Sequence, residues 1–116
     1  MKVIHYKDIP AKHIDNDSAR GVAARLAVGS EDGAKNFVLR VFELAPGGFT
    51  PRHTHDWEHE IFFHSGQGEV LGEGTWHPVR PGSAVFVPAG QEHQVRNAGG
   101  DPLVFVCLIP AGPPEL

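Results

Sequence analysis

Apolar and polar residues alternate along most of this chain in short runs that turns separate. Residues 22 to 28 alternate strictly, and residues 36 to 44 continue as a run rich in β-formers. No stretch shows a sustained helical period. The same reasoning predicts further strands at residues 59 to 65, 69 to 71, 75 to 79, 83 to 87, 93 to 96 and 103 to 109.

Glycine and proline punctuate these runs throughout the chain, with 14 and 10 residues respectively. The sequence Ala-Pro-Gly-Gly-Phe at residues 45 to 49 is expected to end the second run, and only residues 12 to 20 could carry a helical turn. Many short strands at close spacing predict an all-β sandwich, jelly roll or small barrel. Residues 110 to 114 are expected to form a surface tail.

Composition narrows the class of protein. A chain of 116 residues with 41% apolar and 21% charged residues is typical of one globular domain. A net charge of −4 without a basic patch argues against a nucleic-acid partner, and no apolar run is long enough for a membrane span or a signal peptide. The single cysteine excludes an internal disulfide framework. We therefore expect a cytoplasmic protein that binds a small molecule.

Histidines gather in two segments. The first is His53-Thr-His55-Asp-Trp-Glu-His59-Glu60, and in the second an apolar run ends at Pro88, turns at Gly90 and reaches His93. Alternation along a strand would place His53 and His55 on one face. Neutral imidazoles are common ligands of divalent transition metals. The two segments therefore predict the halves of one metal site.

Both segments resemble the two motifs of the cupin superfamily, and the resemblance covers about residues 36 to 110. It implies a double-stranded β-helix, or jelly-roll barrel, that holds one divalent metal in its mouth. It also implies a barrel at residues 36 to 116, preceded by an extended segment at residues 1 to 35. The second motif is matched at Gly82, Pro88, Gly90, His93 and Asn97, and the first at Gly47, His53, His55 and Glu60, with Gly66 one residue early.

The identity of the third motif ligand is open, because the common cupin site has three histidines and one glutamate, and both His59 and Glu60 are candidates here. If His59 points into the barrel, Ile61 and Phe63 do so too, and Glu60 points outward. The opposite choice would bury the more polar set. Strand parity therefore favours His59.

The first segment also resembles a subgroup of small single-domain cupins with a four-histidine, manganese-type site. That resemblance implies His53, His55, His59 and His93 as ligands. It implies one divalent transition metal per subunit, manganese first, although imidazole also suits iron, cobalt, nickel, copper and zinc. Residues expected to line the pocket are Glu60, Phe105, Cys107 and Ile109, whereas the remaining histidines are expected to be structural.

Three functions follow as hypotheses. Four imidazoles on an octahedral ion would leave two positions for oxygen and an organic substrate, which favours a dioxygenase-type oxidoreductase. A metal-dependent isomerase or lyase is the alternative and requires a general base. A non-catalytic cupin that binds a small molecule is the third. We also expect a homodimer, in which residues 1 to 35 cover a sheet edge of their own barrel or of the partner's.

Overall fold

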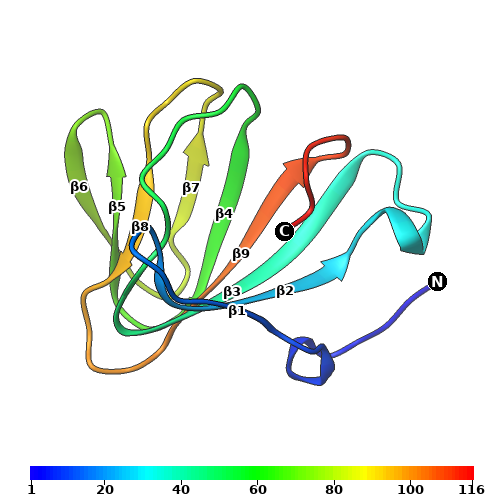
Figure 1. Ribbon diagram of the computed structural model, residues 1–116, viewed down its shortest axis with the longest axis horizontal. Helices are drawn as coiled ribbons and strands as arrows, with labels where there is room; N and C mark the ends of the chain where they lie inside the picture. The colour runs from blue at the N-terminus through cyan, green and yellow to red at the C-terminus, as the bar shows by residue number, and fades with distance from the viewer.

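Nine strands and two short 3-10 helices make up the computed structural model, which describes residues 1 to 116 (Figure 1). This is the all-β architecture that the alternation predicts. No helix in the chain is both long enough and apolar enough to cross a membrane. The elements in chain order are η1 (Tyr6–Asp8), β1 (Lys12–Ile14), β2 (Arg20–Val28), η2 (Ser30–Asp32), β3 (Phe37–Phe49), β4 (His59–Ser65), β5 (Gly68–Gly72), β6 (Thr75–Val79), β7 (Ala84–Val87), β8 (Gln94–Asn97) and β9 (Leu103–Pro110).

The strands form one curled antiparallel sheet in the order β6-β5-β8-β3-β9-β4-β7, with β2 paired to β3 and β1 to β2 (Figure 1). Curling brings distant parts of the sheet to face each other, since Val70 of β5 and Val87 of β7 line a common cavity. The result is the jelly-roll barrel that the sequence predicts. Its concave side faces the metal-ligand candidates.

Inward-facing residues of neighbouring strands form the core. Phe105 of β9 pairs across the sheet with Phe42 of β3 and with Phe63 of β4, and the three aromatic rings fill one layer. In β4, burial alternates residue by residue: His59 is buried and Glu60 is exposed. The parity predicted for this strand is therefore confirmed.

Two local predictions were wrong. Residues 45 to 49 do not end the strand, because β3 runs on to Phe49 and there pairs with Arg20 and Arg96. Gly47 adopts a φ of +78°, and the pairing with β2 shifts register here, so the segment bends instead of breaking. Residues 12 to 14 form β1 on the edge of β2, where tertiary pairing outweighs the weak local helical signal.

Candidate metal centre

The two histidine segments meet through backbone hydrogen bonds. His53 and His55 lie in the loop between β3 and β4, so the expectation that a strand would place them on one face was wrong. Instead, His53 and His93 form an isolated antiparallel bridge, in which each N–H donates to the other's carbonyl at 3.2 and 3.1 Å. Gly90, at a φ of +81°, donates its N–H to the carbonyl of His55 at 2.7 Å. Long-range pairing thus holds both segments at the barrel mouth.

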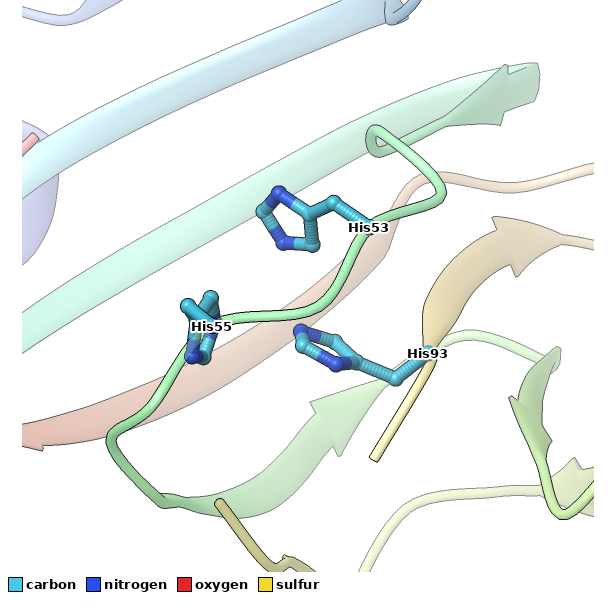
Figure 2. Close-up of side chains that lie close together, drawn as sticks. All are labelled: His53, His55 and His93. Carbon is cyan, nitrogen blue, oxygen red and sulfur yellow. The ribbon is translucent and has the colours of Figure 1, made fainter. Parts of the chain in front are cut away.

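Three imidazoles converge at this junction (Figure 2). One ring nitrogen from each of His53, His55 and His93 lies within 4.8 Å of the others. Two nitrogens bound to one ion at about 2.1 Å each are at most about 4.2 Å apart, so these rings need a shift of only a fraction of an ångström. This three-histidine cluster could hold a metal ion.

Backbone carbonyls orient two of these rings. Nδ1 of His55 lies 2.9 Å from the Trp57 carbonyl, and Nδ1 of His93 lies 2.9 Å from the Gln91 carbonyl. A carbonyl oxygen only accepts hydrogen bonds, so each Nδ1 carries the proton and each Nε2 keeps a lone pair. Metal-binding histidines are commonly fixed in this way. The Trp57 ring also stacks on His55, with centroids 4.2 Å apart.

His59 reaches the cluster from β4. Its Nε2 lies 2.8 Å from Nε2 of His55, and its ring centroid lies 5.0 Å from that of His93. Because the His55 Nε2 carries the lone pair, the His59 Nε2 donates the hydrogen bond between them. Nδ1 of His59 lies 3.1 Å from the Cys107 sulfur. In the other tautomer of His59 the proton is on Nδ1. The Cys107 sulfur can then accept a hydrogen bond from Nδ1–H, and Nε2 is free to bind a metal.

Burial favours the neutral form of three imidazoles, those of His53, His59 and His93. Desolvation, reinforced by the charge of Arg40, lowers the pKa of His59 to about 3. Desolvation also lowers the pKa of His53 and of His93 below its ordinary value. The same cause raises the pKa of the Cys107 thiol. Around neutral pH the site therefore presents neutral imidazoles, the form that binds a metal.

A cavity of about 210 Å³ opens over the four rings. Phe105 and Cys107 line it, whereas Glu60 is exposed on the outer face and Ile109 is buried in the core away from the cavity. Residues 111 to 116 do not simply trail into solvent: Pro114 lines the cavity too. Their path is held where the Glu115 carboxylate accepts hydrogen bonds from Ser30.

Arg40 and Trp57 are among the cavity-lining side chains that sequence reasoning missed. Arg40 occupies an inward position of β3, between the buried Val38 and the cavity-lining Phe42. A charged residue at an inward position of an alternating strand is the signal that would have identified it. Trp57 stands in a loop, where alternation carries no information.

The chain matches only part of the length of its curated relatives. The chain is 35% identical over 94 residues to a glucose-6-phosphate isomerase of Thermococcus gammatolerans, which covers 69% of this chain and 49% of that protein. It is 32% identical over 73 residues to an oxalate-binding protein of Thermotoga maritima, with 58% and 56% covered. The chain therefore spans about half the length of these relatives.

Solved structures and a family model agree on the fold. The polyketide cyclase RemF of Streptomyces resistomycificus has a TM-score of 0.89 and 35% identity, covering 98% of this chain and 82% of that one. A predicted oxalate decarboxylase of Thermotoga maritima has a TM-score of 0.85 and 25% identity, covering 96% of this chain and all of that one. Residues 40 to 109 match the Cupin domain model, and the chain therefore belongs to the cupin superfamily.

Proposed function

We propose that His53, His55, His59 and His93 together hold one divalent transition metal, with manganese as the expected ion. The donor set supports this: it has four adjacent imidazoles, in two of which Nδ1 is bonded to a backbone carbonyl and Nε2 keeps its lone pair. Neutral ligands leave the ion its full charge, whereas a carboxylate ligand would cancel one unit. No Asp or Glu side chain lines the cavity. The centre is therefore suited to binding and polarising oxygen atoms of a small molecule.

The function that this geometry supports best is activation of a carbonyl substrate, as in a metal-dependent isomerase, lyase or cyclase. The observation that carries it is the cavity itself, where neutral imidazoles meet apolar walls without a carboxylate. Similarity to a polyketide cyclase over 98% of the chain, and to an isomerase, supports the same class. Isomerisation needs no external oxidant. The similarity to these two proteins therefore favours activation of a carbonyl group over a reaction with dioxygen.

The chain's own residues set the substrate's surroundings. The stacked rings of Phe42 and Phe105, with centroids 5.4 Å apart, give the substrate an apolar wall that excludes water. A bound divalent ion would supply Lewis acidity. No carboxylate lines the cavity, and its four imidazoles are the proposed metal ligands, so the chain offers no free base there. This favours substrates that are already acidic, such as 1,3-dicarbonyl compounds.

Deuterium exchange tests this proposal. Exchange at the α-carbon of ethyl 2-methylacetoacetate in D2O, followed by proton NMR, should be faster with manganese-loaded protein than with metal-free protein or with the same protein after a chelator has removed the metal. The loaded His64→Ala variant, changed at an exposed histidine on the outer face, should match the wild type. Equal exchange rates with and without the ion would contradict carbonyl activation.

Dioxygenase chemistry is the second candidate. It is supported by the apolar cavity wall, which would protect a reactive oxygen species from water. Oxygen uptake by metal-loaded protein with catechol or an enolic substrate, measured with an electrode, would establish it. Tight binding of a small molecule without any turnover would instead support the non-catalytic alternative.

We further propose a homodimer that uses the outer face of the sheet. Phe62 of β4 is 52% exposed and Phe86 of β7 is 59% exposed, and the two strands pair directly. Large exposed aromatics on one sheet face favour a second copy as partner. Light scattering should give twice the chain mass, and Phe62→Lys with Phe86→Lys should give a monomer. Deleting residues 1 to 20 tests whether the segment at residues 1 to 35 contributes: unchanged stability and mass would exclude it.

A further inference from the structure

We propose that Arg40 recognises an anionic carboxylate of the ligand that enters the cavity. This builds on the proposed function, since it names the ligand class for the same cavity. The juxtaposition that carries it is a guanidinium inside an otherwise apolar pocket, next to the candidate metal ligands and without an acidic partner.

Arg40 points into the barrel from β3. Its Nη2 donates to the Cys107 sulfur at 3.0 Å and lies 3.4 Å from Nδ1 of His59. The guanidinium carbon lies 5.0 Å from the centre of the Phe42 ring, within the range of a cation–π contact. The side chain is thus held in place from two sides.

The positive charge of Arg40 has no counter-charge in the protein. The chain's three ion pairs involve other residues, and no Asp or Glu side chain lines the cavity. Nε of Arg40 is buried and has no hydrogen-bond partner. A partly buried charge without a counter-charge is costly, unless a ligand supplies the opposite charge.

A carboxylate group on the ligand would provide what Arg40 lacks in the protein. It supplies the missing negative charge, and one of its oxygens can accept from Nη1 of Arg40, which makes no hydrogen bond within the protein and is not buried. A neutral carbonyl would accept that hydrogen bond more weakly. The ligand's apolar part would lie against the stacked rings of Phe42 and Phe105. We infer that the cavity selects small carboxylates with an apolar or aromatic body over their neutral counterparts.

Calorimetric titration with benzoate, and with benzamide as its neutral counterpart, tests this in both metal-free and zinc-loaded protein. Charge-assisted hydrogen bonds are worth about 1.5 to 3 kcal/mol, so Arg40→Gln should weaken benzoate binding about tenfold or more in both forms. Benzamide binding should not change. Zinc content is measured for each variant, so that benzoate affinities are compared at equal metal occupancy. Arg40→Lys keeps the charge without the planar fork and should fall between wild type and Arg40→Gln. Arg80→Gln, at an exposed arginine outside the cavity, is the matched control.

Three results would overturn the inference: no saturable benzoate binding to the wild type, equal benzoate affinity in Arg40→Gln, or equal losses for benzoate and benzamide. The last would mean that Arg40 only supports the cavity wall. Failure of the metal proposal is separable, because it would appear as absent zinc binding while the Arg40→Gln effect persists in metal-free protein.

Discussion

The eight histidines divide into four at the barrel mouth and four outside it, and the contrast shows what makes an imidazole a ligand. His53, His55, His59 and His93 each lie within 5.0 Å, centre to centre, of at least two other imidazoles. None of the outer four pairs with another imidazole: His64 contacts Ser65 and the edge of the Tyr6 ring, and His77 contacts the Gly72 carbonyl. Residue type is the same in both groups. Position and orientation distinguish them.

Removing an inner histidine should have the largest effect on metal content. His55→Ala or His93→Ala deletes a ligand that a backbone carbonyl has already oriented, so each variant should lose most of its bound metal. Plasma mass spectrometry on dialysed protein measures this. His64→Ala and His77→Ala are the matched outer controls and should retain wild-type content. An equal loss of metal from the inner and outer variants would contradict the distinction between ligand and non-ligand histidines.

Lowering the pH should have the next largest effect, and it should distinguish the inner histidines from the outer ones. Because burial lowers the pKa of His59 in the folded state, the unfolded chain binds more protons once the pH falls below about 6.5. The free energy of unfolding of metal-free protein should therefore decrease from about pH 6.5 down to about pH 3, where the folded state also protonates. Urea unfolding at a series of pH values measures this slope.

The matched comparison uses His59→Gln and His64→Gln. The first should reduce the slope of stability against pH, because it removes one group that titrates differently in the two states, while His53 and His93 still contribute. The second should leave it unchanged. A stability that is independent of pH between 6.5 and 4 in the wild type would contradict neutral burial of the inner imidazoles.

Cys107 should matter less than the ligands themselves. Its sulfur lies 3.1 Å from Nδ1 of His59, where it can accept a hydrogen bond from Nδ1–H in the tautomer that leaves Nε2 free. Residues that hydrogen-bond to a metal ligand typically change metal affinity about 10- to 100-fold. Cys107→Ala should therefore weaken metal binding about tenfold. Cys107→Ser keeps an acceptor and should lose less. Competition with a zinc-selective chelator measures both, and wild-type affinity in Cys107→Ala would exclude the role.

Glu60 should have the smallest effect. Its side chain is exposed on the outer face of β4, next in sequence to the inward His59. Glu60→Gln should therefore keep the metal content of the wild type, measured on the same dialysed samples. A marked loss of metal would show that this carboxylate reaches the ion.

Alternation and motif spacing predicted much of the fold, because each strand has to bury one face whatever its neighbours are. The β4 parity, and with it the inward His59, is of this kind. The bend that carries β3 through Gly47 was not predictable, since it depends on pairing with Arg20 and Arg96 from distant segments. Likewise, His53 is placed by its bridge to His93 and not by a local strand.

Arg40 shows the same limit at the level of chemistry. Its inward position could be read from the β3 pattern, but its lack of an acidic partner depends on what β9 and β4 place across the cavity. Cys107 and Ile61 occupy those positions. Only the assembled barrel reveals an unpaired charge beside the candidate ligands.

X-ray absorption at the metal edge of manganese-loaded protein tests the central claim most directly, because it counts the imidazoles bound to the ion. We predict four imidazole nitrogens, no sulfur and no protein carboxylate, with one imidazole fewer in His59→Ala. Three imidazoles with a carboxylate, or an unchanged spectrum in His59→Ala, would contradict the four-histidine centre.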